Sequence, residues 1–218
     1  MKTYLFFIVL FVCINGYGQS NGFSASYNRK VSMFKQLPDT RHEIIFLGNS
    51  LTAGAEWAEL LQNPKVKNRG ISGDTTKGIL YRLSEVTSSS PDKVFLLIGL
   101  NDLATGVAKE KVFENICKIA EQIRKDSPRT KVFIQSMLPV NDPLRESPIK
   151  KDDEIVWVNG QVKEWCSQNN FTFIDLYNHF VIPGSQLLNP VHTNDGGHFT
   201  GEAYQIWAGI IKDYVKRK

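Results

Sequence analysis

The chain has 218 residues, of which 42% are hydrophobic and 22% charged, as expected for one globular domain with a substantial core. Its formal net charge of +4 is small, and the only dense basic cluster is the C-terminal tail, so nucleic acid is not indicated as a partner. The three cysteines have no C-x-x-C spacing, which excludes a cysteine zinc site and a dithiol redox motif.

The first 18 residues have the pattern of a signal peptide. A short basic start precedes an apolar run over 4–12, which is short for a membrane span, and small residues stand before Gln19. We therefore expect an exported protein, periplasmic or extracellular, whose mature part is the single domain 19–218, without stable membrane insertion after cleavage. Two alternatives stay open. One is lipoprotein processing at Cys13, which lacks the preceding small residue, and the other is an uncleaved anchor.

Two cysteines belong to the expected mature chain. Cys117 and Cys166 each lie within a helical pattern. Export would permit a disulfide between them, but buried thiols are the simpler expectation.

Five apolar runs of strand length recur along the chain, and helical patterns alternate with them. Continuous apolarity is typical of strands that are buried on both faces. The runs cover 44–47, 66–71, 94–98, 132–134 and 171–174, and the helical patterns cover 53–61, 75–87, 109–124, 154–168 and 201–215. Strands that alternate with helices form a parallel sheet covered by helices on both faces. The sequence therefore predicts one doubly wound α/β domain.

Polar residues follow three of these strands at their C-terminal ends, where doubly wound sheets bind ligands. Segment 48–50 follows the first strand, 72–74 the second and 99–102 the third. The segment after the fifth strand, 177–200, is long, and long loops in compact domains are often functional. A functional site is expected at this edge of the sheet.

Ser50 by itself is a candidate N-cap of the helix that follows the first strand. Nucleophilic catalysis by serine also requires a base, an acid that orients the base, and donors for the oxyanion. Among the four histidines, His198 is the best candidate base because Asp195 lies three residues upstream and can reach the same face. The alternative for Asp195 is to cap the helix that begins near Gly201. His42 precedes the first strand and is expected at the opposite end of the sheet.

Candidate donors for an oxyanion stand at the ends of neighbouring strands. Asn101 follows the third apolar run, and its side-chain amide can donate a hydrogen bond to a developing negative charge. The backbone N–H groups of Ser50 and Gly73 can supply two more. For Gly73 an ordinary turn position is an equally simple explanation.

Four segments together resemble the motifs of the SGNH or GDSL hydrolases, in that family's order and spacing. They are 48–51, with asparagine at position 49 where aspartate is more frequent, then 68–75, 99–102 and 195–198. The resemblance implies a three-layer α/β/α sandwich with a flavodoxin-like five-stranded parallel sheet. It implies a triad of Ser50, His198 and Asp195 and no metal or organic cofactor. The oxyanion hole would consist of Ser50, Gly73 and Asn101.

On this basis we expect Ser50 to attack an ester carbonyl and form an acyl-enzyme, which water activated by His198 hydrolyses. No long apolar stripe lies near the motifs, and small exported relatives often deacetylate carbohydrates, so we predict an O-acetyl ester on a sugar or glycan. Trp57, early in the first helical pattern, is a candidate for stacking on a sugar ring. Burial of Trp57 in the core is the more frequent alternative.

Two other functions stay open. A lysophospholipase or an esterase like platelet-activating-factor acetylhydrolase would use apolar residues of segment 180–188 as a wall for the acyl chain. An inactive carbohydrate-binding relative would keep the fold alone, although the complete set of Ser, Asp, His and Asn argues against it. The partner is in each case a small molecule or a glycan ester, and the oligomeric state is not predicted.

Overall fold

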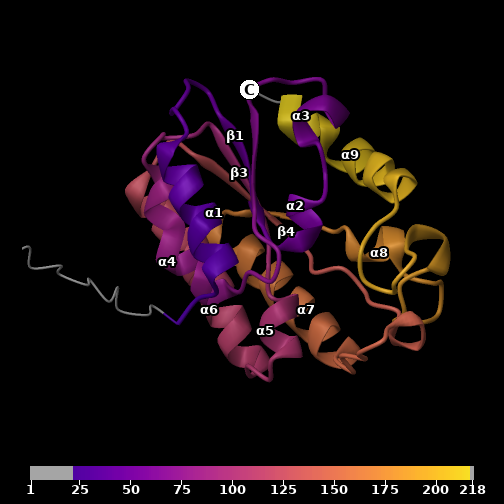
Figure 1. The fold of residues 1–218 in the computed structure, drawn as a ribbon. Coiled ribbons are helices and arrows are strands. Elements are labelled where there is room, and N and C mark those ends of the chain that lie inside the picture. Colours follow the sequence, from indigo (N-terminus) through magenta and orange to yellow (C-terminus); the bar gives the residue numbers. More distant parts are fainter. Residues whose placement is uncertain (1–21, 217–218) are drawn as a thin grey trace, which may run out of the picture.

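The centre of the computed structural model, which describes residues 22–216, is a parallel sheet with strand order β2-β1-β3-β4-β5 (Figure 1). The strands are β1 (Ile44–Gly48), β2 (Val66–Gly70), β3 (Lys93–Leu97), β4 (Lys131–Gln135) and β5 (Thr172–Ile174). The chain winds outward from β1 to β2 and then returns past β1 to β3. The direction of winding therefore reverses between β1 and β3, the place where such sheets bind ligands. The expected signal peptide lies outside the described residues.

Helices fill the connections between the strands and flank the sheet at both ends of the chain. They are α1 (Ala25–Gln36), α2 (Ser50–Ala53), α3 (Trp57–Leu60), α4 (Thr76–Thr87), α5 (Leu100–Ala104), α6 (Lys109–Asp126), α7 (Asp152–Asn169), α8 (Tyr177–Phe180) and α9 (Gly201–Lys216). Four of the five expected helices agree with the structure within two residues at each end. The expected helix 53–61 is not continuous, since α2 ends at Ala53 and the single turn of α3 begins at Trp57. Helices α1, α5 and α8 were not expected.

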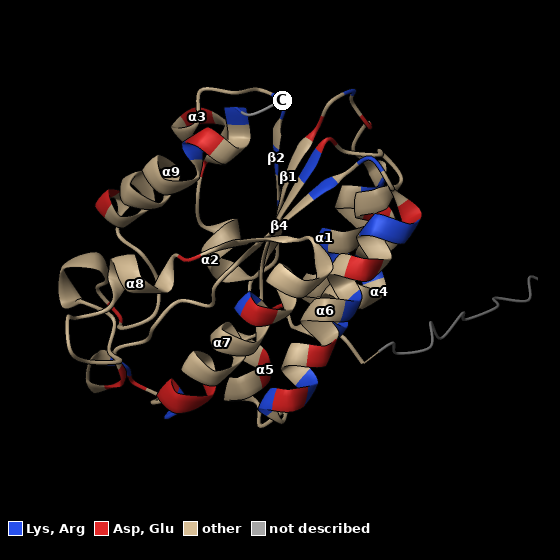
Figure 2. Ribbon diagram, turned by 180° about the vertical axis from the view of Figure 1, so that it is seen from behind, with Lys and Arg blue, Asp and Glu red and all other residues tan. Residues whose placement is uncertain are grey.

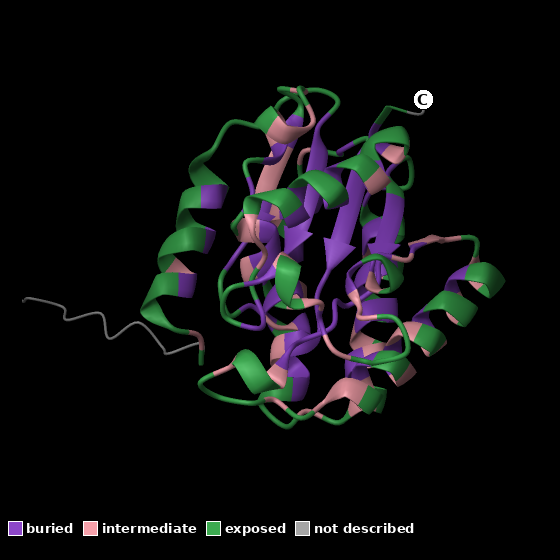
Figure 3. Cartoon of the chain, turned by 90° about the vertical axis from the view of Figure 1, so that its right-hand side faces the viewer, coloured by how far each residue is buried: buried purple, intermediate pink, exposed green. Residues whose placement is uncertain are grey.

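The sheet has a different apolar layer on each face. On one face Phe46, Phe95 and Phe133 stack with ring centroids 4.8 and 4.7 Å apart, and α3, α8 and α9 cover them. On the other face Ile45 and Leu96 belong to the core formed with α4, α6 and α7. Figure 3 shows the strands buried along most of their length. The predicted three-layer α/β/α sandwich is confirmed.

Helix α1 packs against α4 from outside this sandwich. Its residues Tyr27, Val31 and Phe34 are buried together with Ile71, the residue that follows β2. Ser24 caps its first turn by accepting a hydrogen bond from the N–H of Tyr27. This helix thereby covers the side of the molecule on which β2 continues into α4.

The charges and thiols agree with the simpler expectations. In the view of Figure 2, residues of both signs are spread over helices and loops. Cys117 on α6 and Cys166 on α7 are buried free thiols, and burial raises the pKa of Cys117 to about 12. In the described part of the chain, no helix combines the length and the apolar composition needed to cross a membrane.

Candidate active site

The turn between β1 and α2 presents the Ser50 hydroxyl. Asn49 is the N-cap of α2, since its Oδ1 accepts the N–H of Leu51 at 3.1 Å. Ser50 is therefore the first residue of the helix, and the interpretation of Ser50 as a cap is wrong. An amide oxygen accepts this hydrogen bond as a carboxylate does, so asparagine at position 49 preserves the turn.

Side chains of β2 and α9 donate hydrogen bonds that hold the single turn of α2 in place. The side-chain nitrogen of Asn68 donates to the carbonyls of Thr52 and Ala55 at 3.0 and 2.9 Å. Tyr204 donates its hydroxyl hydrogen to the carbonyl of Leu51 at 2.9 Å. Because the last carbonyls of a helix need partners from outside it, these donors explain how so short a helix persists.

The structure brings Ser50, His198 and Asp195 into one hydrogen-bonded row. The Nε2 atom of His198 lies 3.0 Å from the Oγ atom of Ser50, although 148 positions separate the two residues. The Nδ1 atom of His198 lies 2.6 Å from Oδ2 of Asp195. The serine hydroxyl, imidazole and carboxylate thus have the order required to deprotonate the serine.

Asp195 is held as an anion by its own loop. Its Oδ1 accepts the N–H groups of Gly197 and His198 at 2.9 and 2.7 Å. Partial burial opposes ionisation, but these hydrogen bonds and the His198 side chain hold the pKa of Asp195 well below its usual range. At the start of α9 the N–H of Ala203 points to Thr200 Oγ1 at 3.4 Å. The alternative that Asp195 caps this helix is therefore not what the structure shows.

The loop that carries Asp195 and His198 is fixed by a segment that follows β4. Buried Asn141 donates its backbone N–H to the carbonyl of Gly196 and its side-chain nitrogen to the carbonyl of Leu188, both at 2.8 Å. Gly196 has a φ of 76°, and a Cβ atom there would collide with the carbonyl of Asn141. Sequence reasoning missed Asn141, because nothing local links it to position 196.

The three predicted oxyanion donors lie at the ends of adjacent strands. In the register of the sheet, Gly48 of β1 is level with Gly70 of β2 and Leu97 of β3. The Ser50 N–H is at the first position of α2, where no carbonyl of the same helix can accept it. Gly73 has a φ of 77° and open space beside it. The side-chain nitrogen of Asn101 donates one hydrogen to the carbonyl of Asp74 at 2.8 Å, which orients the other.

Trp57 does not take part in this site. Its side chain is 1% exposed and stacks on Phe46, with the ring centroids 4.5 Å apart. Its indole N–H donates to the carbonyl of Thr52 at 2.8 Å. The proposed stacking of Trp57 on a sugar ring is therefore wrong. The apolar layer between β1 and α9 buries the residue, as the alternative held.

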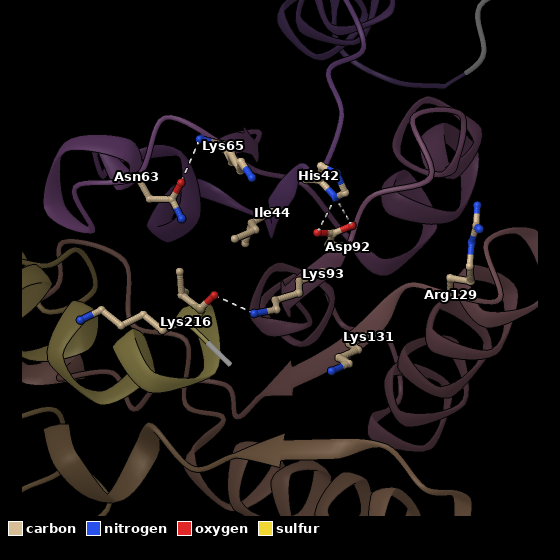
Figure 4. Close-up of a pocket in the computed structure, with 10 residues that line it drawn as sticks. His42, Ile44, Asn63, Lys65, Asp92, Lys93, Arg129, Lys131 and Lys216 are labelled. Atoms are coloured by element: carbon tan, nitrogen blue, oxygen red, sulfur yellow. Dashed lines mark hydrogen bonds and ion pairs between the residues drawn. The ribbon is translucent and has the colours of Figure 1, made fainter. Parts of the chain in front are cut away.

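The opposite end of the sheet contains a different His–Asp pair. His42 Nδ1 lies 3.1 Å from Asp92 Oδ2, beside a hollow of about 420 Å³ lined by several lysines (Figure 4). One of them, Lys93, donates to the carbonyls of Tyr214 and Val215 at the C-terminal end of α9. The expected position of His42, away from the site, is confirmed.

The site itself is open to solvent. The side chains of His198 and Asp195 are 56% and 55% exposed, and Ser50 is half-buried. A bulky alcohol group can therefore approach Ser50 without entering a tunnel. Within residues 22–216, no group of three or more His, Cys, Asp and Glu side chains has an arrangement that could hold a metal ion.

Comparison with known proteins places this geometry in a family. The model of the GDSL-like lipase/acylhydrolase family matches residues 46–206. A crystal structure of a GDSL-like lipase from Bacteroides thetaiotaomicron has a TM-score of 0.77 and 28% identity, and the match covers 87% of this chain and 97% of that chain.

Two curated relatives extend the comparison. An N-acylneuraminate cytidylyltransferase of Streptococcus agalactiae is 26% identical over 88% of this chain, and the match covers 42% of the relative. The platelet-activating factor acetylhydrolase IB subunit alpha1 of Bos taurus is 31% identical over 50% of this chain and 50% of the relative. The chain thus spans about half the length of these relatives or less. The chain belongs to the GDSL-like lipase/acylhydrolase family.

Proposed function

We propose that the chain is an exported serine esterase that removes short acyl groups, above all O-acetyl groups, from a carbohydrate. The observation that carries the proposal is the row of hydrogen bonds from Ser50 through His198 to Asp195. The three proposed oxyanion donors, which are the N–H groups of Ser50 and Gly73 and the side-chain amide of Asn101, lie next to this row at the ends of the strands. Export is supported by the signal-peptide pattern of residues 1–18.

In the first half of the reaction, Ser50 Oγ attacks the ester carbonyl while His198 Nε2 takes the hydroxyl proton. Asp195 accepts the hydrogen bond from Nδ1 and stabilises the imidazolium that forms. The N–H groups of Ser50 and Gly73 and the Asn101 amide hold the oxyanion of the tetrahedral intermediate. The C–O bond to the alcohol then breaks, and His198 returns its proton to the departing alkoxide.

In the second half, water replaces the alcohol. His198 takes a proton from the water as its oxygen attacks the acyl carbonyl, and a second tetrahedral intermediate occupies the same donors. Collapse breaks the bond to Ser50 Oγ and releases the carboxylic acid. His198 gives its proton back to the serine, so the enzyme is unchanged.

Two observations support a short acyl group on a bulky, polar alcohol. The triad lies open at the surface, which suits a glycan better than an enclosed acyl chain. The names of two relatives refer to removal of an acetyl group and to an N-acylated sugar acid, respectively. Together they favour an acetyl ester on a carbohydrate.

The second candidate is a lipid esterase, which the 31% identity to the acetylhydrolase subunit favours. Its acyl chain would need the apolar residues of segment 180–188. Phe180 and Leu188 of that segment are 0% exposed and belong to the core under α9. This burial leaves less apolar surface for an acyl chain than the sequence suggested.

The test is release of acetate from acetylated sialic acids, xylans, peptidoglycan and lysolipids by the purified enzyme, with Ser50→Ala as the matched control. We expect Ser50-dependent release from at least one carbohydrate and faster turnover of p-nitrophenyl acetate than of the octanoate. A preference for octanoate and lysolipids would favour the lipid esterase. If the purified enzyme hydrolysed none of these esters and Ser50 did not react with a fluorophosphonate, an inactive carbohydrate-binding domain would be the better description of the chain.

A further inference from the structure

A cluster of buried charges lies directly behind the three oxyanion donors. Arg82 of α4 is 0% exposed, and its Nη2 atom lies 2.9 Å from Oδ2 of Asp74. Arg69 of β2 pairs with Glu85 of α4 at 2.8 Å, and these two side chains are 8% and 2% exposed. Buried charges are costly unless they are paired, so a buried cluster of this kind is expected to have a structural or functional role.

Arg82 links the ends of two adjacent strands to the turn that carries Gly73. Its guanidinium donates from Nε to Asp74 Oδ2 at 3.0 Å and from Nη2 to the carbonyl of Arg69 at 2.7 Å. The same Nη2 lies 3.5 Å from the carbonyl of Gly48, two residues before Ser50. One rigid, planar group thus contacts β1, β2 and the turn after β2.

Asp74 transmits this restraint to the other donors. Its backbone carbonyl accepts the Asn101 side-chain hydrogen at 2.8 Å, and its Oδ1 accepts the N–H of Thr75 at 2.9 Å. Its own N–H donates to the carbonyl of Ile71 at 3.1 Å, which closes the turn around Gly73. The N–H of Gly73 and the carbonyl that orients Asn101 therefore belong to two neighbouring residues, Gly73 and Asp74.

The cluster is sealed by α1, which lies outside the residues that the family model matches. The Phe34 ring of α1 lies 5.0 Å from the guanidinium carbon of Arg69 and 5.8 Å from that of Arg82. Tyr27 of the same helix donates its hydroxyl hydrogen to the carbonyl of Gly78 at 2.7 Å. With water excluded, the hydrogen bonds of Arg82 are stronger and more directional than they would be at the surface.

Building on the proposed function, we propose that Asp74 and Arg82 are a positioning pair for the oxyanion hole. The pair holds the Gly73 N–H and the Asn101 amide at the place where negative charge develops on the substrate. Neither residue touches the reacting atoms, so the pair acts through the donors. A displacement of donors by about 1 Å can cost about 100-fold in rate.

The test compares two neutralising, isosteric substitutions in the same buried cluster. Asp74→Asn places an amide against the Arg82 guanidinium and releases the turn. Glu85→Gln removes the charge that faces Arg69 Nε at 2.8 Å and Arg82 Nη1 at 3.6 Å, whereas Asp74 is bound by the other guanidinium nitrogens of Arg82, Nε and Nη2. For Asp74→Asn we expect a fall in kcat of about 10- to 100-fold with KM within about twofold of wild type. For Glu85→Gln we expect a lower Tm and a kcat within about twofold of wild type.

A further readout is specific for the oxyanion hole. Sulfur is larger than oxygen and a poorer hydrogen-bond acceptor, so a thionoester gains less from the hole than the matching ester. Asp74→Asn should therefore lower the ratio of ester to thionoester turnover, and it should cost less in an Asn101→Ala background than in wild type. Glu85→Gln should leave the ratio unchanged.

Equal losses of kcat in Asp74→Asn and Glu85→Gln, or an unchanged ester-to-thionoester ratio, would overturn the proposal. If Asp74→Asn does not fold, Arg82→Lys gives the same readouts, because it keeps the charge and loses the paired contacts to Asp74 and Arg69. These comparisons are made on an enzyme whose wild type shows Ser50-dependent hydrolysis. A wild type without that activity would contradict the proposed function instead.

Discussion

The two ends of the sheet each carry an exposed His–Asp pair, and the pair at the C-terminal ends of the strands lies within hydrogen-bond distance of a serine hydroxyl. His198 and Asp195 lie 2.6 Å apart at the C-terminal ends of the strands, and His42 and Asp92 lie 3.1 Å apart at the opposite end. At the first end the second imidazole nitrogen lies 3.0 Å from Ser50 Oγ. Backbone N–H groups also converge there, because strands run into helix starts and turns. A His–Asp pair is therefore a common motif, and its surroundings decide its chemistry.

The largest expected effect comes from removing the nucleophile. Ser50→Ala should lower kcat on p-nitrophenyl acetate by about 10⁵-fold, since the proposed acyl-enzyme forms on Ser50 Oγ. His42→Ala is the control from the opposite end and should retain wild-type kcat. Steady-state kinetics on both variants checks the comparison. Activity retained by Ser50→Ala would mean that the reaction uses a different group.

The second prediction substitutes the carboxylates of the two pairs. Asp195→Asn should lower kcat by about 10³- to 10⁴-fold, because an amide no longer selects the tautomer of His198 or stabilises the imidazolium. Asp92→Asn makes the same chemical change at the other end and should leave kcat as it is. A similar response of the two variants in the same assay would remove the distinction between the two ends.

The third prediction concerns the proposed oxyanion donors at the same end of the sheet as His198. Asn101→Ala should lower kcat by about 100- to 1000-fold with little change in KM. The proposed role of the Asn101 amide is to stabilise the oxyanion of the transition state and not to bind the ground-state ester. The measurement is a full kcat and KM determination on acetate esters. An unchanged kcat would exclude Asn101 from the oxyanion hole.

The last prediction concerns stability and contrasts the exposed carboxylates with buried Asp74. Burial raises its pKa from 3.8 to about 6, and Arg82 acts in the opposite direction. Because the pKa is higher in the folded protein, this carboxyl stabilises the fold below about pH 3.8, and the contribution is lost as pH rises through about 6. From well below pH 3.8 to well above pH 6, the unfolding free energy of wild type should fall by about 3 kcal/mol relative to that of Asp74→Asn.

Urea unfolding of wild type and Asp74→Asn at about pH 4 and about pH 7.5 measures this difference. The gap in unfolding free energy between the two proteins should change with pH in the stated direction. A constant gap would mean that Asp74 has the same proton affinity in the folded and unfolded states.

Local patterns predicted the elements that form the frame of the site. Strands of five or fewer residues were located by their continuous apolarity, since burial on both faces leaves that mark on each strand by itself. For the helix expected over 53–61, a distant contact overrides the local pattern. Helix 53–61 divides into α2 and α3, and Asn68 from β2 supplies donors to the end of α2. Helix α1 packs outside the sandwich and has no counterpart in the alternation of strands and helices.

The sequence by itself determined which residue types stand at the strand ends, and with them the parallel sheet, the candidate chemical roles and the family resemblance. Those features depend on composition, periodicity and order, which the chain carries locally. Only the tertiary structure decided that Trp57 is core and that Arg82 lies behind the proposed oxyanion donors. These are contacts between separate strands, helices and loops, and they depend on how side chains pack in three dimensions.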